Sequence, residues 1–298
     1  MSEAIEAMGS SLVQHGSGHD RAYLKKLHPD DAPRIIDCLE QLVCSEGYSK
    51  ICARIPAWEV GRFVSAGYQL EAAIPGFFPE GGSACFMAKY FCADRKLERQ
   101  PLLVRDVLVA ADAQQRAVEP PLPGSFAVRG AGAGDADQMA ALCAEVCARG
   151  HSALRKPEQL RAAMKGGTIF FGVWEGEGAV ALSSAAVDFA SSSAEMADFA
   201  ILPEHRGHGL AQHLLQRMEE HLVTLGIRSV FGTVRAYSFG MNLTFARNGY
   251  RFGGTLTNNI KAYGGLESVN VWHKALPEDP RFAWKFLFEA GAAQDGNT

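Results

Sequence analysis

The sequence lacks the features that direct a protein to a membrane or to nucleic acid. None of its apolar segments approaches the roughly 20 residues that span a bilayer. Its formal net charge of −4 gives no reason to expect a polyanion as a partner. The first residues have neither the basic start nor the apolar core of a signal peptide. We therefore expect a cytoplasmic protein that binds neither nucleic acid nor a membrane.

Motifs for metal binding and for a nucleophilic serine are missing as well. The seven cysteines show no CxxC spacing and lie mostly among apolar neighbours, which is typical of reduced, buried thiols. His205, His208 and His213 cluster, but no second group of metal-ligand type lies near them. We therefore expect no metal. A G-x-S-x-G elbow is also absent, which argues against a serine hydrolase of that kind.

A proline-rich segment divides the chain. Pro120, Pro121 and Pro123 follow a polar stretch, a composition that favours a linker or an exposed crossover. We predict an N-terminal α/β domain over residues 1–120, a second domain over residues 121–277 and a tail over residues 278–298. In the second domain the hydrophobic periodicity gives the order β-α-α-β-β-β-α-β-α-β-β. This order predicts an α/β fold with a mixed sheet.

A strand, a glycine-rich turn and an amphipathic helix from Leu210 onward carry the clearest functional signal. The first N–H groups of a helix have no intrahelical partner, and the helix dipole favours an anion there. Gly207 and Gly209 have no side chain to keep a diphosphate away from the main chain. Arg206 adds a permanent positive charge. The segment predicts a site for a cofactor with a pyrophosphate group; the alternative is a turn that only packs against a neighbour.

The same segment resembles the pyrophosphate loop of GNAT acetyltransferases, because Arg206, Gly209 and Ala211 fall on its R-x-x-G-x-A positions. The resemblance implies acetyl-CoA as co-substrate, with its pantetheine arm along the strand before the loop. It also implies that a substrate amine attacks the thioester directly. The residues expected to contact the cofactor belong to the strand end, the loop and the start of the helix: Phe199, Ile201, Leu202, Arg206, Gly207, His208, Gly209, Leu210 and Ala211.

Two carboxylates are candidates for the residue that accepts the proton of the substrate amine. Many GNAT enzymes carry a tyrosine four residues before the glycine that ends the last helix, and here that position is Phe245, which cannot exchange a proton. Some members instead carry a glutamate on the strand before the loop, and Glu195 fits that offset. Asp198 lies on the other side of the strand and is the second candidate. The alternative is that Glu195 is an ordinary solvent-facing carboxylate.

A closer resemblance covers the chain from about residue 12 to residue 276. The segments FGMNLTFARNGYRFGGTLTNN and GGLESVNVWHK resemble the C-terminal signature of β-lysine N-acetyltransferases. EGYSKICARIPA and GYQLEAAIPGFF resemble the N-terminal region of that family. The family transfers acetyl from acetyl-CoA to the side-chain amine of β-lysine and makes Nε-acetyl-β-lysine, a compatible solute. Two alternatives stay open: an acetyltransferase for another small amine or a protein lysine, and a sensor that binds acyl-CoA or an amino acid without turnover.

β-Lysine has a carboxylate and two ammonium groups, so its site needs both donors and acceptors. In GNAT folds the last strands border the amine pocket, so the resemblance suggests Asn258, Asn259, Glu267 and Asn270 as substrate contacts. Glu267 would pair with an ammonium group. The alternative is that the asparagines only cap turns. Homo-oligomerisation is left open by the sequence.

The two halves of the chain also resemble each other. In each half a strand leads to a helix that ends in Phe-x-x-x-Gly-Tyr, at Phe63 and at Phe245, and two more strands follow. No R-x-x-G-x-G/A motif occurs before Ser49. We therefore predict that the N-terminal domain is a smaller, partial GNAT-like half without a pyrophosphate loop. Chance similarity is the alternative.

Overall fold

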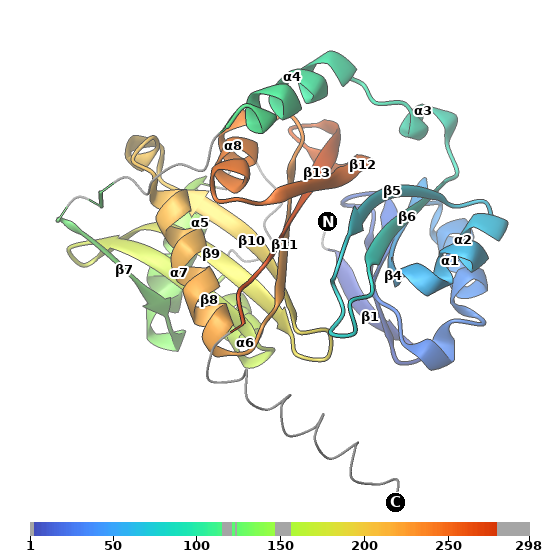
Figure 1. Cartoon of the computed structure of the whole chain (residues 1–298), viewed down its shortest axis with the longest axis horizontal. Coiled ribbons are helices and arrows are strands. Elements are labelled where there is room, and N and C mark those ends of the chain that lie inside the picture. The colour runs from blue at the N-terminus through green and yellow to red at the C-terminus, as the bar shows by residue number, and fades with distance from the viewer. Residues whose placement is uncertain (1–2, 115–120, 123, 147–155, 279–298) are drawn as a thin grey trace, which may run out of the picture.

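The computed structural model describes residues 3–114, 121–122, 124–146 and 156–278, and its strands form one mixed sheet (Figure 1). The strands of the N-terminal half are β1 Ala4–Met8, β2 Ser11–Gly16, β3 Arg21–Lys26, β4 Lys50–Pro56, β5 Gln69–Ile74 and β6 Ala84–Tyr90. Those of the C-terminal half are β7 Phe126–Ala131, β8 Thr168–Glu175, β9 Gly178–Asp188, β10 Ser193–Ile201, β11 Ser229–Arg235, β12 Arg251–Ala262 and β13 Gly265–Ala275. The mixed α/β class expected from the sequence is confirmed.

Helices pack on the sheet in both halves. In the N-terminal half they are α1 Ile35–Glu46, α2 Val60–Ser65 and α3 Ala93–Lys96, and α4 Pro101–Asp112 leads toward the C-terminal half. The C-terminal half has α5 Ala136–Val146, α6 Pro157–Lys165, α7 Leu210–Thr224 and α8 Phe239–Arg247. Single 3-10 turns occupy Pro29–Asp31, Ala57–Glu59, Ala133–Asp135 and Pro203–His205. Figure 1 shows α1 and α2 on the side of the N-terminal strands that faces away from the C-terminal half.

The two halves share one strand order. In the N-terminal half β3 runs parallel to β4, and β6 and β5 follow in that order. In the C-terminal half β10 runs parallel to β11, and β13 and β12 follow in the same way. Strand β7 and helices α5 and α6 have no counterpart among the described residues of the first half. This shared order is the structural counterpart of the internal similarity in the sequence.

The domain limits at residues 120 and 277 stay a prediction, and one helix bears on them. Helix α4 lies inside the predicted N-terminal range, yet Ala111 is buried in the core that α7 and α8 form on the C-terminal sheet. Gln114, just after α4, accepts a hydrogen bond from Arg247 at the end of α8. Two of the three linker prolines, Pro120 and Pro123, lie outside the described residues.

The two halves join where β5 pairs antiparallel with β12, at Ala72 and Gly254. A Cβ at Gly254 would lie 2.2 Å from the carbonyl oxygen of Glu71, so the close approach requires a glycine. The inner faces of the two halves share a core cluster, which includes Tyr23 and Phe86 from the first half and Phe231 and Val271 from the second. The halves are therefore parts of one packed body.

Strands β3 and β4 alternate between an apolar and a polar face. Ala22 and Leu24 on β3, with Ile51 and Ala53 on β4, pack in the core with α1. The other positions face the C-terminal half, because successive side chains of a strand point to opposite faces. These inner positions are Arg21, Tyr23 and Lys25 on β3 and Lys50, Cys52 and Arg54 on β4.

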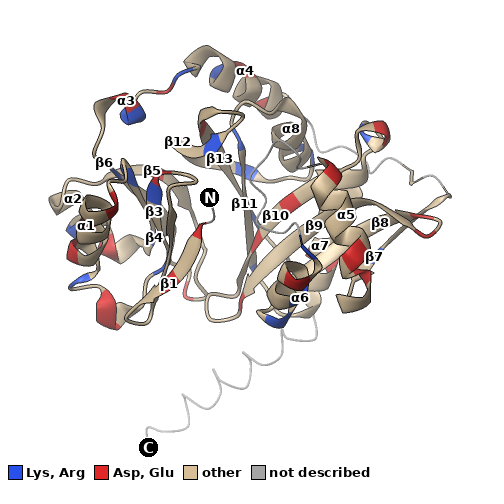
Figure 2. Ribbon diagram, turned by 180° about the vertical axis from the view of Figure 1, so that it is seen from behind, with Lys and Arg blue, Asp and Glu red and all other residues tan. Residues whose placement is uncertain are grey.

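Charged residues of both signs are spread over both halves (Figure 2). None of the described helices is both long enough and apolar enough to cross a membrane. The described cysteines form no disulfide with one another. Cys52, Cys85 and Cys143 are buried as expected, but Cys38, Cys44 and Cys92 are exposed, so the expectation of buried thiols was wrong for these three. Cys147 lies outside the described residues.

Candidate functional site

Strands β10 and β11 separate halfway along β10. They pair in parallel only from Ser193 opposite Ser229 to Met196 opposite Gly232. Beyond Met196 a bulge shifts the register of β10, and Asp198 takes a left-handed conformation with φ of 52°. The rest of β10 then pairs only with β9. Within the described residues its other edge has no strand partner, so an extended ligand can bind along it.

The glycine-rich loop follows β10 directly. Gly207 and Gly209 have φ of 85° and 72°, a region that favours glycine, and Gly209 caps the start of α7. Among the described residues, no backbone carbonyl accepts from the N–H groups of residues 207–211. No atom lies within 4 Å of the position of a Cβ on Gly207. The loop therefore offers unpaired N–H donors to open space, as an anion site requires.

The predicted cofactor residues fall into two groups. Arg206, Gly207, His208 and Gly209 form the loop itself, and the Arg206 side chain is exposed, with its Nε 3.4 Å from the carbonyl oxygen of Ile201. The others anchor the loop, since Leu210 and Ala211 are buried and Phe199, Ile201 and Leu202 pack on the adjacent core. Their contacts with a cofactor stay a prediction.

Glu195 lies on the inner face of β10 and meets the first half of the chain. Its carboxylate is 3.7 Å from Nζ of Lys25, and its side chain is 17% exposed. Desolvation alone would raise the pKa of Glu195, but Lys25, Arg54 and Arg21 together hold it below its ordinary value. Glu195 is therefore ionised at neutral pH and is a weak base.

Asp198 has the opposite electrostatic environment. Asp198 is open to solvent on one side, but protein atoms surround its carboxylate. Their desolvation raises the pKa of Asp198, and the negative charge of Glu195 raises it further. Ser184 donates a hydrogen bond of 2.6 Å to it, which opposes the shift. A carboxylate with a raised pKa is the better acceptor for a proton. Of the two predicted catalytic carboxylates, Asp198 thus suits a general base better.

Phe245 occupies a closed position in the core. It is fully buried, its ring centroid lies 5.9 Å from that of Phe199, and a Cβ on Gly232 would lie 2.6 Å from its ring. The ring of Tyr250 packs against it at 4.7 Å, but burial raises the pKa of Tyr250 well above 10. Neither ring supplies an easily exchanged proton.

Three of the four predicted substrate residues are engaged by the chain itself. Arg235 binds the Glu267 carboxylate through two hydrogen bonds of 2.7 and 2.9 Å, so a guanidinium occupies the place expected for a substrate ammonium. The side chain of Asn270 bridges Asn242 and Thr255. The amide of Asn258 donates to the carbonyl oxygens of Arg95 and Leu97. These bonds favour the turn-capping alternative for Asn258, whose φ is 46°.

Like Oδ1 of Asn258, the side-chain Oδ1 of Asn259 is buried without a hydrogen-bond partner among the described residues, and Asn259 is 3% exposed. An unpaired buried acceptor is costly, so this oxygen can bind a donor from a ligand. The assignment of all four residues to the substrate stays a prediction.

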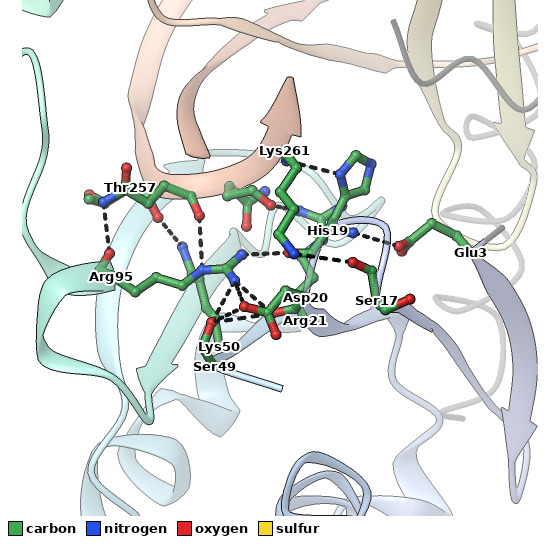
Figure 3. Close-up of polar contacts among 12 residues, drawn as sticks. Glu3, Ser17, His19, Asp20, Arg21, Ser49, Lys50, Arg95, Thr257 and Lys261 are labelled. Carbon is green, nitrogen blue, oxygen red and sulfur yellow. Dashed lines mark hydrogen bonds and ion pairs between the residues drawn. The ribbon is translucent and has the colours of Figure 1, made fainter. Parts of the chain in front are cut away.

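Basic side chains of the first half hold the segment around Asn258 (Figure 3). The register of β12 shifts between Leu256 and Ile260, which leaves consecutive carbonyl groups without sheet partners. Lys50 donates to the carbonyl oxygen of Thr257 over 2.7 Å, Arg95 to that of Asn258 over 3.1 Å and Arg21 to that of Asn259 over 2.8 Å. The end of β12 is thus positioned by the N-terminal half.

The inner faces of β3 and β4 are the part of the site that sequence reasoning missed. Tyr23, Lys25 and Arg54 lie near Glu195, and the two cations lower the pKa of its carboxyl group. The only signal was the alternation of charged and apolar residues in RAYLKK and KICARIP. A strand with one face in water shows the same alternation.

Among the described residues, no group of three His, Cys, Asp or Glu side chains could hold a metal ion.

Comparisons with known proteins agree with this geometry. Residues 141–250 match the acetyltransferase (GNAT) family. The chain is 27% identical to a β-lysine N6-acetyltransferase of Methanococcus maripaludis over 272 residues, which cover 91% of this chain and 98% of that protein. It is 29% identical to the N-acetyltransferase YodP of Bacillus subtilis over 206 residues, 69% of this chain and 74% of that protein.

Solved structures show a weaker likeness. A phosphinothricin acetyltransferase of Sinorhizobium meliloti, solved in complex with acetyl-CoA, is 15% identical to this chain. The match has a TM-score of 0.46 and covers 53% of this chain and 91% of that structure.

Proposed function

Because the chain is an N-acetyltransferase with a GNAT domain, we propose that it transfers the acetyl group of acetyl-CoA to the side-chain amine of β-lysine. The product is Nε-acetyl-β-lysine, which serves as a compatible solute. The observation that carries the proposal is the extent of the similarity to the enzyme of M. maripaludis, which covers 91% of this chain. A GNAT domain alone accounts only for residues 141–250. The similarity therefore includes the N-terminal half that faces β10.

The loop and β10 have the parts that acetyl transfer needs. The diphosphate of acetyl-CoA binds the N–H groups of residues 207–211, and the pantetheine arm lies along the open edge of β10. Asp198, near the bulge, accepts a proton from the substrate ammonium group, and the free amine attacks the thioester carbonyl. The C–S bond then breaks, and CoA leaves as a thiol with the second proton that the nitrogen loses. Electrostatic stabilisation of the oxyanion by backbone N–H groups is typical of such acyl transfers.

A small amine fits this site better than a lysine on a protein surface. The first half of the chain packs opposite β10, with Lys25 in contact with Glu195 and Lys26 bonded to Asp188 over 2.9 Å. A folded protein has no comparable access to the inner face of β10. This observation favours a free amine among the alternatives.

The proposal is tested by following thiol release from acetyl-CoA with a panel of amines. We expect β-lysine to give the highest kcat/KM. L-α-Lysine should be slower by up to about 10⁴-fold, because a site that binds a substrate group rejects an analogue in which that group is displaced. Tandem mass spectrometry of the product should place the acetyl group on Nε.

Three outcomes would contradict the proposal in different ways. A preference for spermidine or a lysine peptide would replace the substrate and leave the acetyltransferase in place. Equal kcat/KM for α-lysine and β-lysine would remove the selectivity claim. Binding of acetyl-CoA without thiol release in the presence of any amine would favour the sensor.

A further inference from the structure

Four residues on the inner faces of β3 and β4 form, with Glu195 of β10, what we call the inner cluster: Arg21, Tyr23, Lys25 and Arg54. Lys25 contacts Glu195, and Arg54 and Arg21 act on the same carboxylate electrostatically. Three cations thus share one carboxylate, and positive charge remains in excess even when Asp198 is counted. Lys50 does not add to this balance, because it is paired with Glu71 at 2.8 Å.

Arg54 differs from the other two cations of the cluster, since Lys25 pairs with Glu195 and Arg21 donates to a carbonyl oxygen. Its guanidinium carbon lies 4.9 Å from the ring centroid of Phe231 and 5.5 Å from that of Phe77. Among the described residues, none accepts a hydrogen bond from the guanidinium of Arg54, and no carboxylate lies within 4 Å of it. The aromatic rings fix the guanidinium and leave its planar set of donors available.

Two buried donors in the same cluster also lack acceptors. Tyr23 is 6% exposed, and its hydroxyl has no hydrogen-bond partner among the described residues. Arg21 is equally buried, and its Nε is unpartnered although its Nη1 binds the carbonyl oxygen of Asn259. Unpaired buried donors destabilise a fold unless a ligand supplies the acceptor. The missing group is therefore an anion with several acceptor atoms.

The position of the cluster argues against the diphosphate of acetyl-CoA as this anion. Glu195 precedes Ile201, the last residue of β10, by six positions, which is about 20 Å along an extended strand. The glycine-rich loop lies beyond that end. The cluster therefore lies beyond the acetyl end of a cofactor that is bound at the loop.

The spacing suits an amino acid with a long side chain. Phe231, under Arg54, pairs with Glu195, and Asp198 follows three residues later, about 7–10 Å along β10. An extended six-carbon diamino acid spans about 7–8 Å from its carboxylate carbon to its terminal nitrogen, with bonds near 1.5 Å. Its carboxylate and its terminal amine can thus reach Arg54 and Asp198 together.

We propose that the inner cluster binds the amino-acid head of the acceptor substrate, with Arg54 and Tyr23 on its carboxylate and Glu195 on the neighbouring ammonium group. Glu195 is then a specificity residue, and the reacting amine lies at the bulge of β10. This inference rests on the proposed transfer to an amino-acid amine. It assigns substrate recognition to the N-terminal half.

The test compares β-lysine with 1,5-diaminopentane, which has a similar terminal amine and no carboxylate. In Arg54→Gln we expect KM for β-lysine to rise about 10–150-fold, the range for the loss of a hydrogen bond to a charged group. KM for 1,5-diaminopentane and for acetyl-CoA should stay within twofold. Arg54→Lys, which keeps the charge but loses the planar fork, should give a smaller rise.

The matched control is Lys89→Gln. Lys89 is a partly buried cation on β6 that pairs with Glu40 and lies outside the cluster, so its replacement should leave both KM values unchanged. An equal loss with β-lysine and diaminopentane in Arg54→Gln would mean that Arg54 only supports the fold, and it would overturn the assignment. Equal kcat/KM of the unmodified enzyme for β-lysine and 1,5-diaminopentane would also overturn the assignment.

The experiment also separates this inference from the proposed function. If the enzyme prefers another amine that carries a carboxylate, β-lysine is wrong, and the Arg54 comparison is made with that amine and its decarboxylated analogue. If no amine is acetylated, binding is measured calorimetrically with CoA present. The inference is overturned if no amine with a carboxylate binds more tightly to the unmodified protein than to Arg54→Gln.

Discussion

At the scale of single residues, Glu195 and Asp198 show how neighbours assign roles to two similar groups. They lie three positions apart on β10, but three cations lower the pKa of Glu195 and desolvation raises the pKa of Asp198. Pairs of carboxyl groups whose surroundings push their pKa values apart are typical of acid–base sites. The structure thus favours Asp198 as the base and Glu195 as a binding group.

We expect Asp198→Asn to lower kcat by about 10²–10⁴-fold, which is the usual contribution of a general base. Activity of the unmodified enzyme should fall as the pH drops through the raised pKa of Asp198, because the protonated carboxyl cannot accept a proton. Glu195→Gln should mainly raise KM for the amine. Steady-state kinetics against pH measure both effects. A larger loss of kcat in Glu195→Gln would reverse the two roles.

Glu195 also links pH to stability. Because its folded pKa is lowered, its stabilisation is fully present above the pKa of the unfolded chain and is lost as the pH falls through the folded pKa. The Tm difference between the unmodified protein and Glu195→Gln should therefore be present at pH 7 and shrink in acid. A difference that is independent of pH would show that packing, not charge, is lost.

The sequence predicted individual residues only where a motif constrains them. The loop residues follow from their place between a strand and a helix. Glu267 and Asn270 could not be assigned in this way, because their partners are distant in sequence: Arg235 lies on a neighbouring strand and Asn242 on helix α8. Arg54 could not be predicted either, because its neighbours Phe77 and Phe231 come from different halves of the chain.

At the scale of elements, the proposed cofactor site is the unit of β10, the loop and α7. The strand loses its partner after Met196, two glycines turn the chain, and buried Leu210 and Leu214 fix α7 against the sheet. These features are local, since they depend on glycine conformation and on the 3.6-residue period. That is why the sequence predicted this unit well and the contacts between the halves poorly.

We expect Arg206→Ala to weaken acetyl-CoA binding by about 1.5–3 kcal/mol, the range for a hydrogen bond to a charged group. Isothermal titration calorimetry measures the change. The control is Arg217→Ala on α7, because Arg217 is exposed and pairs only with Glu220 one turn on. Unchanged affinity in Arg206→Ala, or an equal loss in the control, would contradict a role of Arg206 at the diphosphate.

At the scale of the whole molecule, the continuous sheet brings residues of the two halves into contact at the proposed site. Glu195 from the second half meets Lys25 from the first, and the carbonyl groups after Leu256 receive hydrogen bonds from Lys50, Arg95 and Arg21. The sequence indicated a related strand order in each half but gave no sign that their edges pair. The strands pair at Gly254, and both Gly253 and Gly254 closely approach the backbone of β5.

We expect Gly254→Ala to destabilise the junction, because the added Cβ would meet Glu71 and Ala72 at under 3 Å. Its cost should exceed the roughly 1 kcal/mol of an ordinary substitution, and KM for the amine should rise. Urea denaturation and kinetics measure the two effects. Gly240→Ala is the control, since no atom lies within 4 Å of its Cβ position. Equal stability of both variants would mean that the junction adapts.

The pairing of β5 with β12 also has a consequence for the order of events during synthesis. Strand β5 ends at Ile74, and its partner β12 begins at Arg251, so the ribosome adds about 180 residues between them. At 5–20 residues per second this takes roughly 10–40 s. During that time the nascent chain presents an unpaired strand edge, which is a template for wrong pairing. Glu71 on β5 places a charged group at that edge, and inward-pointing charges discourage association of strand edges.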